Sequence, residues 1–339
     1  MAKSILITGN AGLLGSRMCD WILEKRQEYE VVGIDNLFGG YMDNVDPRVV
    51  FYRRDLAKDS ITDIFDKHDF EYVFHFAAYA PEGLSPFMRM FTDQNNILST
   101  DNVINECVNH NVKRLIFTSS MAVYGRGEWN GKKFEEHDQP TPIDPYAVSK
   151  YACELNVMNA GEIHGLDWCI IRPHNLYGKK QNIWDRYRNV LGIWMYRTIN
   201  NEPILIYGDG RQTRAFSYVD DCLEPLWDAA VNERASKEII NLGATRETEI
   251  KEAAEILCDI TGVHDIEYRE ERFEVKYAVP SAAKSKILLN YEDKTTLEEG
   301  LRNMWEWAKN QPVREQFTPE KYEIERGIYG YWRKTEGKA

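Results

Sequence analysis

The sequence predicts an α/β protein built on a doubly wound parallel sheet, with a smaller mixed α/β region on its C-terminal side. Short continuous apolar runs alternate with amphipathic stretches through the first half of the chain. Such runs are typical of parallel strands covered by helices on both faces. A glycine-rich turn joins the first run to the first amphipathic stretch. After Arg172-Pro173 the segments become shorter and more mixed. We therefore expect domains over 1–173 and 174–339, with some later segments returning to the large sheet.

The first half of the chain predicts six buried strands, each an apolar run too short for a helix. In order, they are expected at 3–8, 31–34, 49–53, 72–76, 115–118 and 168–171. Helices are expected between them where apolar residues recur on one face. These helices are expected at 12–27, 87–110 and 145–164.

The second half predicts a smaller and less regular set of elements. Helices are expected near 186–200, 249–261 and 296–309, with a strand at 204–206 followed by a loop at 208–210. The polar and aromatic tail over 312–339 suggests no function by its pattern.

Composition excludes several classes of protein. The chain has 339 residues, 43% of them apolar, and 42 basic against 54 acidic residues leave a net charge of −12. This balance argues against a nucleic-acid partner but leaves room for a basic pocket that binds a small anion. Six scattered cysteines form no C-x-x-C pair, which predicts reduced core residues and no metal site. No secretory leader or membrane-spanning run is visible, so we expect a cytoplasmic protein without a membrane partner.

The turn after the first strand, Thr8 to Gly15, carries three glycines in the pattern G-x-x-G-x-x-G. Gly9 permits a tight turn, Gly12 lets a backbone approach a pyrophosphate, and Gly15 lets the helix pack close to the sheet. The position between a strand and a helix is the one that dinucleotide binding of the Rossmann type requires. A tight structural turn is the alternative.

Asp35, at the end of the second strand, favours NAD over NADP. A carboxylate there accepts hydrogen bonds from the adenosine ribose and repels a 2′-phosphate, and no arginine is adjacent. Asp55-Leu56, after the third strand, is expected near the adenine, although a surface aspartate or a helix cap is an equal interpretation. Ala77-Ala78 provides small residues where the dinucleotide crosses the sheet.

Tyr146 and Lys150 lie four residues apart, on one face of a predicted helix. A nearby ammonium and a positive nicotinamide ring would lower the pKa of a tyrosine and let it act as a base toward a substrate hydroxyl. A serine at the end of the fifth strand would bind the same oxygen. Ser119 and Ser120 are both candidates, because side chains alternate along a strand and only one can face the site.

Together these motifs resemble the extended short-chain dehydrogenase/reductase family, in its nucleotide-sugar epimerases and dehydratases, with the UDP-galactose 4-epimerases as the nearest branch. The resemblance covers about residues 3–225 well and the remainder loosely. It implies a homodimer formed by the helices at 87–110 and 145–164, and Ser120 as the catalytic serine beside Tyr146 and Lys150. The cofactor residues it implies are Gly9, Asn10, Ala11, Gly12, Leu13, Leu14, Gly15, Asp35, Asn36, Asp55, Leu56, Phe76, Ala77, Ala78, Asn96, Tyr146, Lys150 and Pro173.

The resemblance also implies a nucleotide-diphosphate sugar as the substrate. The residues expected to bind it are Ser120, Asn175, Asn189, Arg214 and Lys276. Lys276 stands in a segment that departs from the family's R-x-G-D pattern, so it either replaces an arginine or is solvated. Arg186 and Arg188 either read a sugar carboxylate or form a solvated helix face. The base and the sugar are not specified.

The residues after the catalytic serine distinguish the family's reactions. Dehydratases and decarboxylases resemble each other in carrying a carboxylate there for C5 chemistry, whereas this chain has Met121 and Ala122. The resemblance therefore implies a 4-epimerase that oxidises sugar C4, turns the 4-keto sugar and returns the hydride. A 4,6-dehydratase or other C5-active enzyme is the alternative, with a base among His75, Glu82, His174 and Lys179. A non-catalytic NAD-binding protein ranks lower, because such relatives typically lose the Tyr/Lys pair.

Overall fold

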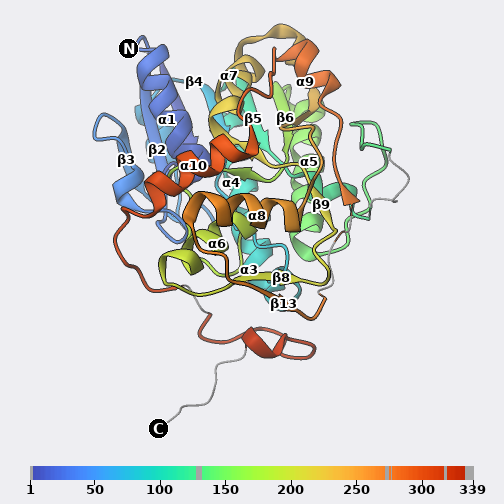
Figure 1. Ribbon diagram of the computed structural model, residues 1–339. Helices are drawn as coiled ribbons and strands as arrows, with labels where there is room; N and C mark the ends of the chain where they lie inside the picture. The colour runs from blue at the N-terminus through green and yellow to red at the C-terminus, as the bar shows by residue number, and fades with distance from the viewer. Residues whose placement is uncertain (1–2, 127–131, 272–274, 276, 317–318, 333–339) are drawn as a thin grey trace.

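The computed structural model describes residues 3–126, 132–271, 275, 277–316 and 319–332 (Figure 1). Its centre is a seven-stranded sheet in the order β11-β6-β5-β4-β1-β2-β3, with every neighbouring pair parallel. The strands are β1 Ser4–Thr8, β2 Glu30–Asp35, β3 Val50–Arg53, β4 Phe70–His75, β5 Arg114–Thr118, β6 Trp168–Pro173 and β11 Glu238–Leu242. The strand order reverses between β1 and β4, which is where doubly wound sheets bind ligands. The predicted fold class is confirmed.

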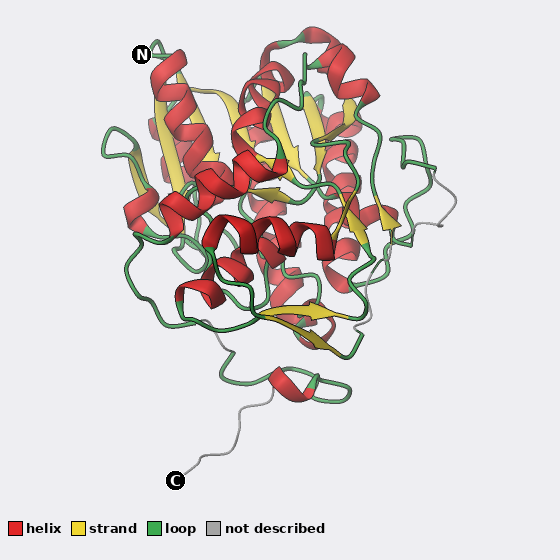
Figure 2. Cartoon of the chain, in the orientation of Figure 1, coloured by secondary structure: helices red, strands yellow, loops and turns green. Residues whose placement is uncertain are grey.

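Both faces of the sheet are buried, because successive side chains of each strand point to opposite faces. Ile5 and Ile7 of β1 join one core with α1 (Leu13–Lys25) and α7 (Leu223–Val231). Leu6 joins the other core with α2 (Thr62–Lys67), α4 (Ser99–Asn109) and α5 (Pro145–His164). These helices and the large sheet therefore form the sandwich seen in the upper part of Figure 2.

The smaller region lies beyond the carboxyl ends of the strands, in the lower part of Figure 1. Its helices are α6 Val190–Ile199, α8 Ile250–Thr261 and α10 Leu297–Ala308, whereas α9 Ala283–Leu288 lies at the top of Figure 1 and packs against β11 and α7. Its short strands are β7 Leu176–Tyr177 with β10 Ser217–Tyr218, β8 Ile204–Tyr207 with β13 Ile266–Arg269, and β9 Thr213–Arg214 with β12 Thr248–Glu249 and β14 Tyr277–Ala278. Trp194, Leu257 and Leu301 meet in a separate core there. β11 and α7 return to the large sheet, so the two regions share it.

Two predicted helices differ from the structure. The helix expected over 87–110 is divided into α3 (Arg89–Asp93), a π-helical stretch over Gln94–Leu98, and α4. The helix expected near 186–200 begins only at Val190. The residues before it turn instead, because Asn182 Oδ1 accepts hydrogen bonds from the backbone N–H groups of Trp184 and Asp185, at 3.0 and 3.1 Å.

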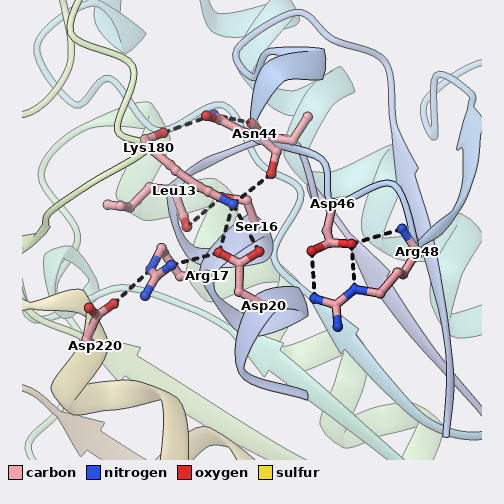
Figure 3. A network of polar contacts seen from close by, with 10 residues as sticks. Leu13, Ser16, Arg17, Asp20, Asn44, Asp46, Arg48, Lys180 and Asp220 are labelled. Carbon is pink, nitrogen blue, oxygen red and sulfur yellow. Dashed lines mark hydrogen bonds and ion pairs between the residues drawn. The ribbon is translucent and has the colours of Figure 1, made fainter. Parts of the chain in front are cut away.

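A polar network joins the two regions beside the glycine-rich turn (Figure 3). Lys180, after β7, contacts both carboxylate oxygens of Asp20 in α1, at 2.7 and 3.0 Å, and the carbonyl of Asn44 at 2.9 Å. Arg17 bridges Asp20 and Asp220. The loop after β7 is therefore held against α1.

The C-terminal segment, defined here as residues 319–332, packs on the smaller region's side of the molecule. Tyr322, Ile328 and Trp332 bury their rings and methyl groups against Phe87 and Tyr187. The hydroxyl groups of Tyr187 and Tyr322 lie 2.8 Å apart.

All six cysteines are buried free thiols, as the sequence predicts. Within the described ranges, no helix combines the length and the apolar character that a membrane crossing requires.

Candidate active site

A cavity of about 1040 Å³ opens at the carboxyl ends of the strands, where the sheet order reverses. Both regions and the C-terminal segment line it. Its described charged residues are eight basic and four acidic, namely Arg54, Lys150, Arg186, Arg188, Arg197, Arg214, Arg269 and Arg326 against Asp35, Asp55, Glu82 and Asp144. An acidic protein thus contains a basic cavity, which suits a ligand rich in phosphate.

The glycine-rich turn shapes one wall of the cavity. Gly9 has φ +70°, and a Cβ there would lie 2.8 Å from the backbone nitrogen of Ala77. A Cβ on Gly15 would lie 2.2 Å from the carbonyl oxygen of Gly9. Gly12 caps α1 without any side-chain hydrogen bond, and no acidic residue stands in the first turn. The N–H groups at this helix end therefore face a cradle that fits a pyrophosphate.

Asp35 lies at the end of β2 with its carboxylate fixed by the backbone. Oδ2 accepts from Ala11 N at 3.0 Å, and Oδ1 accepts from Leu37 N at 2.7 Å. Burial raises the pKa of Asp35, and these two hydrogen bonds act in the opposite direction. The carboxylate lines the cavity beside the glycine turn, which is the geometry that a ribose diol requires.

Asp55 acts as a cap, and the adenine contact expected from its sequence position stays a prediction. It lines the cavity with Leu56. Its Oδ1 accepts from Ala57 N at 3.1 Å and its Oδ2 pairs with Lys58 at 2.9 Å, so the carboxylate also caps the following turn.

Three of the expected cofactor residues do not line the cavity. The side chain of Asn10 is buried against Gly33, and Ala11 is buried while its backbone holds Asp35. Asn96 accepts from Tyr79 N at 2.8 Å and donates to Tyr79 O at 3.1 Å, so it fixes that backbone. The other expected cofactor residues line the cavity, and they are Gly9, Gly12, Leu13, Leu14, Gly15, Asp35, Asn36, Asp55, Leu56, Phe76, Ala77, Ala78, Tyr146, Lys150 and Pro173.

Ser120, Tyr146 and Lys150 meet on the cavity wall. Burial raises the pKa of Tyr146, and its hydrogen bond with Ser120 acts in the opposite direction. Lys150 donates to the carbonyl of Thr118 at 2.7 Å, and burial lowers the pKa of its ammonium to about 8. Asp144 caps the helix that carries both residues by accepting from Ala147 N at 2.9 Å. α5 therefore presents the phenol and the ammonium from one turn.

The two adjacent serines have different partners. Ser120 contacts Tyr146, whereas Ser119 donates to Glu154 Oε1 at 2.5 Å. Glu154 also accepts two hydrogen bonds from Arg172, at 2.8 and 2.6 Å, in a pair with almost no exposed surface. Ser119 also lines the cavity, but its hydroxyl is engaged with Glu154.

Of the four residues weighed as alternative bases, only Glu82 lines the described cavity. His75 is buried between Thr8 and Thr100, and His174 is buried with Nδ1 3.2 Å from the Ala244 carbonyl. Burial lowers the pKa of each imidazole to about 3, so both are neutral. Met121 lines the cavity next to Ser120.

Besides Ser120, three of the expected substrate residues come from the smaller region. Asn175, with φ +35°, donates to Ala215 O at 3.3 Å. Asn189 caps α6 through its bond from Leu191 N at 2.9 Å. Arg214 extends from β9. All three line the cavity with Ser120, whereas Lys276 lies outside the described residues.

The sequence pattern gave no signal for the contribution of the C-terminal segment. Arg326, Tyr329 and Trp332 line the cavity, and Trp332 approaches Gly83. Glu323 accepts from the backbone N–H groups of Met90 and Phe91, at 2.8 and 2.9 Å, and so holds the segment to the start of α3. Only the tail's aromatic content hinted at packing.

The fold and this site define a dinucleotide-dependent enzyme class, the extended short-chain dehydrogenases and reductases. The chain belongs to the NAD dependent epimerase/dehydratase family, whose model matches residues 5–243. NAD is accordingly the cofactor, and the glycine cradle and the placement of Asp35 fit it.

Several proteins are similar over most of the chain. The UDP-glucose 4-epimerase of Halalkalibacterium halodurans is 28% identical, over 91% of this chain and 96% of that protein. The structure of UDP-glucose 4-epimerase from Thermotoga maritima with UDP-glucose matches at TM-score 0.85 and 30% identity, over 90% and 98% of the two chains. UDP-glucuronic acid 4-epimerase from Bacillus cereus, in complex with UDP-glucuronic acid and NAD, matches at TM-score 0.83 and 26% identity, over 90% and 99%.

Proposed function

We propose that this chain is an NAD-dependent 4-epimerase of a nucleotide-diphosphate sugar. The observation that carries the proposal is the pairing of Ser120 with Tyr146 at the strand ends, next to Met121 in the place where C5-active relatives hold an acid or base. In a site of this kind Tyr146 and Ser120 can transfer a proton at one sugar oxygen. The thioether of Met121 cannot carry a proton. The relatives described above are themselves named as 4-epimerases.

Tyr146 is the base in this proposal. It takes the proton of the C4 hydroxyl, and Ser120 donates a hydrogen bond to the same oxygen. When bound, NAD supplies the hydride acceptor at C4, returns that hydride to the other face, and carries a positive ring that favours the phenolate. Lys150, held by the Thr118 carbonyl, places its ammonium at the nicotinamide ribose. Tyr146 then returns the proton to the oxygen, and the mass of the sugar is unchanged.

The substrate's diphosphate is assigned to the wall opposite the glycine turn. Arg214 offers a forked donor suited to phosphate, Asn175 donates to the neighbouring Ala215 carbonyl, and Asn189 lines the same cavity. The sugar would then lie toward Ser120 and Tyr146.

The alternative, a dehydratase or other C5-active enzyme, is favoured by one observation. Glu82 lines the cavity, and its charge acts on the Tyr146 phenol. A carboxylate on this side could remove a C5 proton from a direction that Met121 does not occupy.

The deciding experiment is turnover in D₂O with a panel of UDP-, GDP-, dTDP- and CDP-linked sugars, including uronic acids, followed by mass spectrometry and proton NMR. The proposal expects a C4 epimer of unchanged mass, without deuterium on carbon, because the hydride returns to its own carbon. Deuterium at C5 or loss of one water would replace it with the C5-active alternative. No conversion of any sugar, with NAD bound, would favour the non-catalytic reading. Tyr146→Phe serves as the control that should bind NAD without turnover.

We also propose that the chain is a homodimer through α3, α4 and α5. Together these helices expose five large apolar side chains, and a group of this kind supports an interface. They are Met90 at 68%, Leu98 in the π-helical stretch between α3 and α4 at 51%, Val148 at 50%, Leu155 at 48% and Ile163 at 64% exposure.

A further inference from the structure

The guanidinium of Arg188 lies over the loop that follows the adenosine-binding strand, although Arg188 belongs to the substrate-side region. A Cβ built on Gly39 would lie 2.1 Å from Arg188 Nη2 and 3.0 Å from Cζ. Gly39 is four residues beyond Asp35, and both line the cavity with Arg188. We propose that Arg188 binds the diphosphate of NAD and closes the cofactor site from the opposite region.

Arg188 is held in this position at both ends of its side chain. Nε donates to Asp185 Oδ2 at 2.8 Å, and Asp185 is almost wholly buried. The guanidinium lies over the ring of Tyr79, with Cζ 5.5 Å from the ring centre. The Tyr79 backbone is in turn fixed by Asn96 on both its N–H and its carbonyl. A preorganised guanidinium of this kind loses little conformational freedom on binding.

The loop that carries Arg188 is hydrogen-bonded directly to the loop that follows β2 and contains Gly39. Asn182 donates to the carbonyl of Gly39 at 3.1 Å, and Tyr41 donates to Asn182 at 3.3 Å. Lys180, on the same loop, pairs with Asp20 of α1 (Figure 3). Arg188 and the dinucleotide turn are therefore parts of one fixed assembly, joined across the two regions.

In this proposal the terminal nitrogens of Arg188 bind an anion between the two ends of the cofactor site. Among the described residues, Nη1 and Nη2 make no hydrogen bond. Burial raises the pKa of Asp35 and of Tyr146, and the charge of Arg188 acts in the opposite direction on both. Asp35 marks the adenosine end and Tyr146 the nicotinamide end. The group of NAD between these ends is its diphosphate, and a forked cation complements it.

This assignment separates Arg188 from the sugar carboxylate that Arg186 and Arg188 together suggested in the sequence. Nε of Arg188 is committed to Asp185, and its terminal nitrogens lie at Gly39. The proposal concerns cofactor binding and holds for whichever reaction the site performs, so failure of the epimerase assay would leave it intact.

The test is calorimetric titration of the full-length protein, freed of nucleotide, with ADP-ribose and with adenosine. For Arg188→Gln we expect ADP-ribose to bind roughly ten- to a hundredfold more weakly, since hydrogen bonds to charged groups are lost. Adenosine, which lacks the diphosphate, should bind as in the wild type. Arg188→Lys should lose part of the effect, because the charge remains and the fork does not.

A second variant reaches the same contact from the other side. Gly39→Ala would place a methyl group against Nη2 and displace the guanidinium, so it should also weaken ADP-ribose. The double variant Gly39→Ala/Arg188→Gln should bind ADP-ribose no more weakly than Arg188→Gln alone. UDP, a probe for the substrate wall, is expected to bind all variants equally.

Three results would overturn the proposal. Unchanged ADP-ribose binding in Arg188→Gln would show that Arg188 does not contact the cofactor. Equal losses for adenosine and ADP-ribose would indicate a purely structural role. Additive losses in the double variant would show that Gly39 and Arg188 act separately.

Discussion

Ser119 donates a hydrogen bond to the carboxylate of Glu154 over 2.5 Å, where both side chains are almost wholly buried. Its neighbour Ser120 bonds Tyr146 instead. Two chemically identical side chains therefore have separable roles, one supporting the site and one within it.

Replacing each serine by alanine should separate stability from turnover. Ser119→Ala should lower the free energy of unfolding by about 1.5–3 kcal/mol, the worth of a hydrogen bond to a charged group, with kcat nearly unchanged. Ser120→Ala should lower kcat by about 10²-fold, since it removes a donor to the reacting oxygen, with a smaller loss of stability, because Ser120 Oγ also accepts from Ala122 N at 3.1 Å. Urea denaturation and steady-state assays measure the two effects. The reverse pattern would make Ser119 the catalytic serine.

The buried Glu154–Arg172 pair predicts a strong penalty for removing one partner. Glu154→Leu should cost about 3–5 kcal/mol of unfolding free energy, because it leaves a buried guanidinium uncompensated. Arg172 also lies over the Tyr124 ring, at 4.8 Å from its centre. The matched double variant Glu154→Leu/Arg172→Met should regain much of that loss. A double variant less stable than the single one would contradict this account, and urea denaturation decides it.

Lys150 predicts an alkaline loss of NAD affinity. Its pKa is lowered to about 8 by burial, so the ammonium loses its proton as the pH rises through that value. The charge proposed to hold the nicotinamide ribose is then lost, and NAD affinity should fall roughly tenfold between about pH 7 and pH 10. Lys150→Arg, which stays charged in this range, should show a flat profile. A wild-type profile that is also flat would remove Lys150 from cofactor binding.

Lys150 also makes folding stability depend on pH, and this dependence has the opposite sign to that of NAD affinity. The pKa of Lys150 in the folded protein lies below 10.5, the ordinary value for a lysine, which applies in the unfolded chain. Between these values the unfolded chain holds a proton that the folded chain has released, so the Lys150 contribution to the unfolding free energy rises with pH. Lys150→Met should lack this contribution in urea denaturation of the cofactor-free protein across the same window.

The C-terminal segment predicts an effect on substrate binding alone. Glu323→Gln weakens the two backbone hydrogen bonds that hold the segment to α3, and Trp332→Ala removes a wall of the cavity. Both should raise KM with little change in kcat, since the contact is equal in ground and transition states. Val313→Ala, at a position 93% exposed, is the matched control. A fall in kcat at constant KM would place the segment in the chemistry instead.

The exposed apolar residues of α5 predict that charge there disrupts the dimer. Leu155→Glu and Ile163→Glu should convert the protein to monomers in light scattering coupled to gel filtration, because a charge would be desolvated at the interface. Val313→Glu should remain dimeric. A wild-type protein that is monomeric at micromolar concentration would exclude the interface.

The large sheet could be predicted because its signals are local. The structure around Gly9, Asp35 and the apolar runs depends on residues only a few positions away in the chain. The helix expected at 145–164 accordingly begins and ends as predicted. The choice between Ser119 and Ser120 required the resemblance, since Glu154 and Arg172 lie far along the chain.

The substrate side was harder because its contacts are distant in sequence. The turn before α6 depends on Asn182 accepting from Trp184 and Asp185, which no helical periodicity reveals. Arg188 approaches Gly39, although the two residues lie far apart in the sequence. The motif containing Asn96 predicted a place near the cofactor site. The structure shows that its side chain bonds the Tyr79 backbone.

The burial of Tyr79, Leu84 and Phe87 beneath Tyr322, Ile328 and Trp332 sets an order on biosynthesis. A nascent chain that has already folded its sheet still exposes these apolar side chains until residues 319–332 have left the ribosome. Such a patch invites association with other chains or with chaperones. A truncation before residue 319 would therefore spare the whole sheet and still leave this patch exposed to association.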